Sequence, residues 1–178
     1  GERRSFVPID SSLEAQFNAV AMDERVQAAL IKLEEREEEA IQEQIRITEI
    51  PAPPFQEERR AAYFLERVKE RGLADAYIDD EGNVVATRPG TGNGPTLLIA
   101  AHLDTVFPAG VDTTVEFRDG RYYAPGIGDD TRGLTVLLSI LEALNESGIT
   151  THADIIFSAN VSEEGRGDLR GVKALFRE

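Results

Sequence analysis

The chain has 178 residues, of which 41% are hydrophobic and 29% charged, a composition typical of a globular domain. Its net charge of −14 argues against nucleic-acid binding, because a polyanion would be repelled over most of the surface. The absence of cysteine excludes disulfides and thiolate metal ligands. No apolar run approaches the roughly 20 residues that cross a membrane, and no signal-peptide pattern follows Gly1–Arg4. We therefore expect a cytoplasmic protein with no membrane or nucleic-acid partner.

The first part of the chain is predicted to be helical. Apolar residues recur at three- to four-residue multiples over residues 11–47, which predicts one long amphipathic helix that ends before the prolines of 51–54. A second helix is expected over 57–71, with Ala62, Phe64, Leu65 and Val68 facing inward. We expect two parts: a helical segment, residues 1–48, that packs on a catalytic part, residues 49–178.

Short apolar runs then alternate with helical patterns. Residues 76–78 and 84–87 flank one turn, and residues 115–117 and 121–123 flank Asp119-Gly120, so two hairpins are expected. Residues 96–101 and 153–161 are apolar without alternation, which is typical of strands covered on both faces. Helices are expected over 133–145 and from 169. This order predicts an α/β fold, a three-layer α/β/α sandwich with a mixed, mostly parallel central sheet.

Polar side chains follow both of the buried strands. His102 and Asp104 end the first, and Glu163 and Glu164 follow the second. If the two strands are parallel neighbours, these side chains converge at one edge of the sheet. Asp104 is then placed to accept a hydrogen bond from an imidazole whose other nitrogen binds a metal. Of the two glutamates, one can ligate a metal while the other holds a proton.

A second acidic pair, Asp129 and Asp130, follows a two-glycine loop and precedes the helix over 133–145. One of them is expected to cap that helix, which leaves the other free. Each cluster also has a simpler interpretation as a strand-end histidine, a helix cap or an acidic turn. Their occurrence together, in order and at strand ends, favours a metal site. His152 begins its strand at the end opposite Glu163 and is interpreted as a surface residue.

Three stretches, Ala101–Val106, Gly128–Gly133 and Ser162–Gly165, resemble the co-catalytic zinc aminoacylase and carboxypeptidase family. This family includes glutamate carboxypeptidase, acetylornithine deacetylase, dipeptidases and tripeptidase T, and the doubled aspartate is most similar to the tripeptidase T branch. Ile50–Pro54 and Asp80–Val85 match as well. The resemblance implies a zinc-exopeptidase-like catalytic domain that is truncated here: the lid and dimerisation domain and the C-terminal part are absent.

The resemblance also implies a role for each matched residue. His102 is similar to a histidine ligand of one zinc, Asp129 to the carboxylate that bridges both zincs, and Glu164 to a ligand of the second. Asp104 is similar to the catalytic carboxylate behind the histidine. Glu163 is similar to the general base, which takes a proton from a water bridging two Zn²⁺ ions. Co²⁺ or Mn²⁺ are alternatives to zinc. A cis peptide bond is implied between Asp129 and Asp130.

The implied activity is hydrolysis of a peptide or N-acyl amide bond in a small peptide or an N-acyl amino acid. Two further metal ligands of the family, one acidic and one histidine, have no match in the sequence. We therefore expect the 178 residues to bind metal weakly and to be inactive alone, and the full-length protein to form a homodimer through its lid domain. Two alternatives are a lid-less zinc aminopeptidase of the related family and a non-catalytic acidic α/β module.

Overall fold

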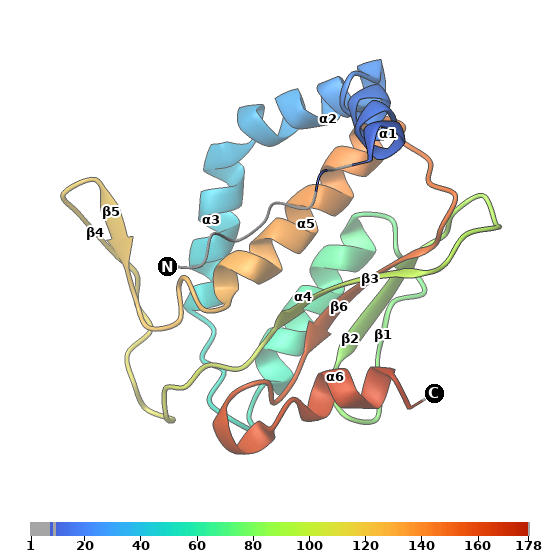
Figure 1. Cartoon of the computed structure of the whole chain (residues 1–178). Helices are drawn as coiled ribbons and strands as arrows, with labels where there is room; N and C mark the ends of the chain where they lie inside the picture. The colour runs from blue at the N-terminus through green and yellow to red at the C-terminus, as the bar shows by residue number, and fades with distance from the viewer. Residues whose placement is uncertain (1–7, 9, 178) are drawn as a thin grey trace, which may run out of the picture.

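The computed structural model describes residue 8 and residues 10–177, so the Gly1–Arg4 segment lies outside the described residues. A run of helices comes first, a run of strands follows, and helices and strands alternate only in the last part of the chain (Figure 1). In order, the elements are α1 (Ser11–Ala21), α2 (Glu24–Glu35), α3 (Glu37–Thr48), α4 (Glu58–Glu70), β1 (Tyr77–Ile78), β2 (Val84–Arg88), β3 (Leu97–His102), β4 (Glu116–Arg118), β5 (Arg121–Tyr123), α5 (Thr131–Glu146), β6 (Ile155–Asn160), a short 3-10 turn at Gly165–Gly167, and α6 (Arg170–Leu175). Among the described helices, none combines the length and the apolar character needed to cross a membrane.

Four strands form one sheet in the order β1-β2-β6-β3, while β4 and β5 form a separate hairpin. The predicted mixed α/β fold is confirmed. Parallel pairing is confined to β3 and β6, however, because β1 with β2 and β2 with β6 are antiparallel, so the described sheet is not mostly parallel. The parallel register pairs Ala101 with Ala159 and His102 with Asn160. The two strands that precede the polar clusters are therefore neighbours and end at the same edge.

The hydrophobic core lies between the sheet and helices α4 and α5. Alternate side chains of β2, β6 and β3 point into it, since successive residues of a strand face opposite sides. The helices contribute Phe64, Val68, Leu134, Leu138 and Leu141, all nearly or fully buried. Helix α5 also contacts β3 on one side and α2 and α3 on the other. This packing fixes the direction in which β3 and β6 deliver their last residues.

The opposite face of the sheet is covered less completely. Helix α6 lies there beside the ends of β2 and β6, where Asn83 donates a hydrogen bond to the Gly171 carbonyl at 3.0 Å (Figure 1). Strand β3 was expected to be covered on both faces, but Leu97 is 51% exposed and Ala100 is also exposed. The difference arises because β3 is an edge strand of the described sheet, with a neighbouring strand on one side only.

Three helices take the place of the single helix predicted over residues 11–47. The carboxylate of Asp23 accepts a hydrogen bond from the Arg25 N–H at 2.9 Å, which caps α2 and separates it from α1. Arg36 separates α2 from α3, and its guanidinium pairs with Glu142 and Glu146 of α5. An aspartate that bonds the backbone just after it favours a new helix start over a continuous helix. Periodicity alone did not reveal this break.

Candidate metal centre

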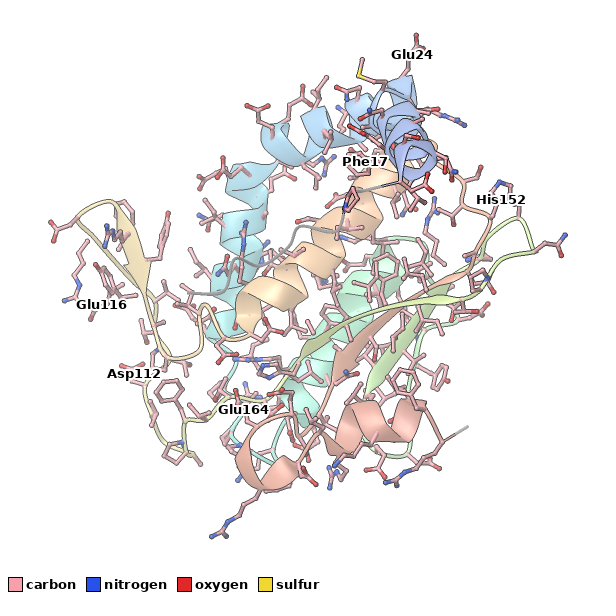
Figure 2. The ribbon with its side chains drawn as sticks, viewed as in Figure 1. Phe17, Glu24, Asp112, Glu116, His152 and Glu164 are labelled. Atoms are coloured by element: carbon pink, nitrogen blue, oxygen red, sulfur yellow. The ribbon has the colours of Figure 1, made fainter. Side chains whose placement is uncertain are left out.

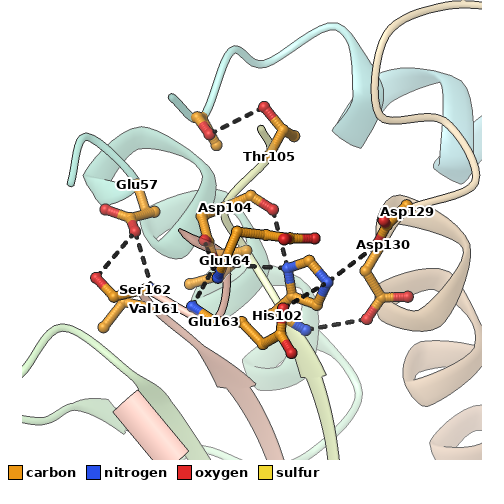
Figure 3. Close-up of polar contacts among 12 residues, drawn as sticks. Glu57, His102, Asp104, Thr105, Asp129, Asp130, Val161, Ser162, Glu163 and Glu164 are labelled. Atoms are coloured by element: carbon orange, nitrogen blue, oxygen red, sulfur yellow. Dashed lines mark hydrogen bonds and ion pairs between the residues drawn. The ribbon is translucent and has the colours of Figure 1, made fainter. Parts of the chain in front are cut away.

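The polar clusters that follow β3 and β6 meet at one edge of the sheet, as predicted (Figure 3). His102 is the last residue of β3, and its Nε2 lies 3.8 Å from Oε2 of Glu163. His102, Glu163 and Glu164 each offer one ligand atom, and these three atoms lie within 4.8 Å of one another. An imidazole and two carboxylates from segments about 60 positions apart in the chain therefore form one cluster.

Of the two adjacent aspartates, one caps helix α5 and the other does not, as the sequence predicts. Asp130 caps α5: its Oδ1 accepts from the Gly133 N–H at 3.2 Å, and its Oδ2 accepts from the His102 N–H at 3.0 Å. The Asp129 side chain is 75% exposed, and its Oδ1 lies 3.0 Å from His102 Nε2. The peptide bond between the two aspartates is cis, as the family resemblance implies. Asp129 is therefore the aspartate that takes no part in the helix cap and contacts the imidazole of His102.

The loop that carries these aspartates is held from two sides. Gly126 adopts a φ of +76°, and a side chain there would press against Thr105, so the loop can lie directly on that residue. On the other side, Gln44 of α3 donates to the Ile127 carbonyl at 2.7 Å. Helix α3 and the segment after β3 thus fix where the loop places Asp129.

Asp104 is fully buried and makes more contacts than the sequence predicts. Its backbone carbonyl lies 2.9 Å from His102 Nδ1, while its Oδ1 lies 3.4 Å from the same nitrogen. The carboxylate also accepts the backbone N–H groups of Glu163 at 3.0 Å and Glu164 at 2.9 Å. Asp104 therefore orients the imidazole and also ties the end of β3 to the turn after β6.

The charges of the cluster shift its proton affinities. Burial disfavours the imidazolium, but the hydrogen bond with Asp104 and the charges of Asp130 and Glu163 outweigh it and raise the pKa of His102 to about 9. Burial likewise works against the Asp104 carboxylate, yet the imidazole and the two amide donors lower its pKa. Burial and the charges of Asp129 and Glu163 raise the pKa of Glu164. A proton on His102 thus compensates a concentration of negative charge.

The residues of this cluster fit a divalent metal ion. With Nδ1 engaged by Asp104, the Nε2 atom of His102 faces Asp129 and Glu163, which is the usual arrangement of a metal-binding histidine. One imidazole with several carboxylates suits zinc, cobalt or manganese. The other histidine, His152, is exposed and lies at the opposite end of the sheet from Glu164 (Figure 2).

Two buried charged residues beside the cluster were not identified from the sequence. Glu57 is 4% exposed, and its carboxylate accepts the Ser162 N–H at 3.0 Å (Figure 3). Arg60 is fully buried and donates to the carbonyls of Leu103 at 2.9 Å and Ile50 at 2.8 Å. Burial raises the pKa of Glu57 and lowers the pKa of Arg60 to about 10. Helical periodicity could have identified them, because residues four and seven positions before Phe64 lie on the same face of the helix as that apolar side chain.

The imidazole and carboxylates lie at the ends of adjoining parallel strands, where open α/β sheets bind their ligands. Residues 98–178 match the model of peptidase family M20/M25/M40, and the chain belongs to this family. The structure of aminopeptidase PepT from Bacillus cereus superposes with a TM-score of 0.65 at 25% identity, over 77% of this chain and 39% of that one.

Two relatives illustrate the range of proteins that the chain is similar to. A protein of Pyrococcus furiosus, whose proposed activity is LysW-lysine/LysW-ornithine hydrolysis, is 33% identical over 128 residues, 72% of this chain and 35% of its own length. Carboxypeptidase G2 of Pseudomonas sp. strain RS-16 is 34% identical over 108 residues, 60% of this chain and 25% of its own length. The 178 residues thus span about a third or less of these relatives, as part of a catalytic domain.

Proposed function

We propose that the full-length protein is a metal-dependent peptidase or amidohydrolase, and that these 178 residues contribute one half of its catalytic site. The observation that carries the proposal is the environment of His102. Its Nδ1 is occupied by Asp104, and its Nε2 faces Asp129 at 3.0 Å and Glu163 at 3.8 Å. This orientation leaves one nitrogen of the imidazole directed at a group of carboxylates, which is what a bound cation requires.

His102, Asp129 and Glu164 are the proposed metal ligands, with Asp129 as the carboxylate shared between two ions. Two Zn²⁺ ions are proposed for the full-length protein, and they would lower the pKa of a water molecule and polarise the substrate carbonyl. Asp129 fits the shared position because its side chain is 75% exposed, its Oδ1 lies 3.0 Å from His102 Nε2, and the helix cap is made by its neighbour Asp130. Asp104 acts behind His102, where its burial and its contacts hold the ring in place.

Glu163 is the proposed general base. Its side chain is 39% exposed, so a water molecule can reach it, and its backbone N–H is fixed by Asp104. The carboxylate would accept a proton from the attacking water and deliver it to the leaving amine. The substrate class that follows is a small peptide or an N-acyl amino acid.

The 178 residues alone are proposed to lack activity and to bind metal weakly. Apart from the proposed base Glu163, they offer one imidazole and two carboxylates as ligands for two ions. A cavity of about 440 Å³ lies between α2, α3 and α5, away from the cluster. Enclosure of the substrate, and a homodimer through a lid domain, are therefore assigned to the remainder of the protein. The division into residues 1–48 and 49–178 is proposed on the same resemblance.

A calorimetric titration of the metal-stripped chain with Zn²⁺ tests the proposal. Binding should be measurable in the parent chain and in His152→Ala, because His152 is exposed and remote from the cluster. It should disappear in His102→Ala. Equal heats in the two histidine variants would contradict the proposed site and would favour the non-catalytic alternative.

A further inference from the structure

The first turn of helix α4 carries two buried charges that face the metal cluster. Glu57 is 4% exposed and Arg60 is fully buried, whereas their neighbours Glu58 and Arg59 are exposed. Building on the proposed function, we propose that Glu57 and Arg60 are positioning residues: each fixes one of the two turns that present the metal-binding side chains. Glu57 holds the turn after β6, and Arg60 holds the turn after β3.

Glu57 acts on the residue that precedes Glu163. Ser162 adopts a φ of +54°, a conformation that residues with a side chain rarely occupy, and its N–H donates to Oε1 of Glu57 at 3.0 Å. Glu57 is the N-cap residue of α4, yet its side chain makes no capping hydrogen bond within its own helix. Its carboxylate is therefore directed at the turn after β6, and Ser162 is held in the conformation that turns Glu163 and Glu164 toward His102.

Arg60 acts on the residue between His102 and Asp104. Its Nη1 donates to the Leu103 carbonyl at 2.9 Å, while Nε and Nη2 donate to the Ile50 carbonyl at 3.1 and 2.8 Å. The planar guanidinium thus joins the turn after β3 to the chain that leads into α4. Leu103 is itself fully buried, so its carbonyl has Arg60 as a partner where water is excluded.

Energetic reasoning supports a positional role over a purely stabilising one. A buried charge loses its hydration, and an apolar side chain of similar size at such a place is often equally or more stabilising. No ion pair joins Glu57 or Arg60 to another residue in the described part of the chain. Glu57 accepts hydrogen bonds from Ser162, and Arg60 joins the Leu103 carbonyl to the Ile50 carbonyl, so what both supply is geometry at the turns beside the cluster.

Amide hydrogen exchange of the metal-free chain tests the inference. Glu57→Met keeps the length of the side chain but removes the acceptor, Glu57→Gln keeps an acceptor, and Glu58→Met is the matched exposed control. We expect exchange at Ser162, Glu163 and Glu164 to rise at least about tenfold in Glu57→Met, and amides in the middle of α5 to stay as in the parent. Glu57→Gln should restore most of the protection. The inference is overturned if folded Glu57→Met leaves the Glu163 and Glu164 amides as protected as in the parent.

A Co²⁺ titration followed by its visible absorption adds the functional readout. Groups that orient metal ligands typically change affinity by about 10–100-fold, and we expect a loss of that size in Glu57→Met with an altered spectrum. Absence of cobalt binding in the parent chain would contradict the metal site itself, while the exchange experiment would still decide the positioning role. If Glu57→Met does not fold, Arg60→Lys takes its place, and unchanged protection of the Leu103 and Thr105 amides in that variant overturns the inference.

Discussion

The carboxylate of Asp104 and the backbone N–H of Glu163 form a hydrogen bond of 3.0 Å that joins two strand ends 59 positions apart in the chain. The second carboxylate oxygen of Asp104 accepts the N–H of Glu164 at 2.9 Å. One buried side chain therefore sets the distance between the imidazole and both glutamates. Its contribution is structural as well as electrostatic, which makes it the first target for mutagenesis.

Asp104→Asn should destabilise the chain by about 2 kcal/mol. An amide side chain keeps one acceptor but turns an N–H₂ group toward the second backbone donor, which then stays unsatisfied in a buried place. Urea unfolding measures the loss, with Asp75→Asn as the control because Asp75 is exposed. An equal effect in the two variants would show that the bonds to Glu163 and Glu164 carry no stability.

Gly133→Ala should disturb the cluster through Asp130. A Cβ atom at Gly133 would overlap the Asp130 carboxylate, which caps α5 and also accepts the His102 N–H. We expect a loss of about 1–3 kcal/mol, the range for a lost cap combined with overpacking. Gly128→Ala is the matched control in the same loop, since nothing lies near the position of its added methyl group. Thermal unfolding of both variants distinguishes the two sites.

The stability of the metal-free chain should fall between pH 6.5 and 9. The pKa of His102 is raised to about 9 in the fold from an ordinary value of 6.5. Because the folded form binds this proton more tightly, the stabilisation is complete below pH 6.5 and is lost as the pH rises through about 9. At about 1.4 kcal/mol per pKa unit, the difference between 6.5 and about 9 corresponds to a contribution of about 3 kcal/mol. His102→Gln should flatten this part of the unfolding free-energy profile; parallel profiles would refute the assignment.

In the full-length protein, the two adjacent glutamates should give different phenotypes. Glu163→Gln should retain metal and lower kcat by about 10²–10⁴-fold, the usual contribution of a general base. Glu164→Gln should instead lose metal, because a ligand is removed. Elemental analysis of the purified variants, together with peptide hydrolysis at saturating metal, separates the two roles. Normal turnover in Glu163→Gln would exclude it as the base.

Much of the fold and of the cluster could be predicted from local pattern. The unbroken apolar runs before His102 and Glu163 predicted two strands, and β3 and β6 are parallel neighbours, which was the condition for their polar residues to converge. Asp-Gly at 119–120 predicted the β4–β5 hairpin, where both residues have positive φ. These features depend on a few adjacent residues, so the sequence displays them directly.

What could not be predicted depends on contacts between distant residues. The helix over 57–71 was expected to turn Ala62 inward along with Phe64 and Val68. Phe64 and Val68 are buried, but Ala62 is exposed and Ala61 is buried in its place. Glu57 and Arg60 were missed because a buried charge is explained by its partners, and those partners lie on other segments of the chain. The burial of the two faces of β3 also depends on which elements pack against the strand, and its apolar composition does not indicate these.

The parallel register of β3 and β6 restricts where insertions and deletions can be accepted during the evolution of this protein. His102 lies opposite Asn160, so a residue inserted within either strand would move an imidazole or a glutamate to the wrong face of the sheet. The chain reverses at the far ends of the same strands, near residues 89–96 and 147–154, where an added residue leaves that pairing intact. Insertions and deletions should therefore collect among homologues at one end of the sheet and be excluded from the other.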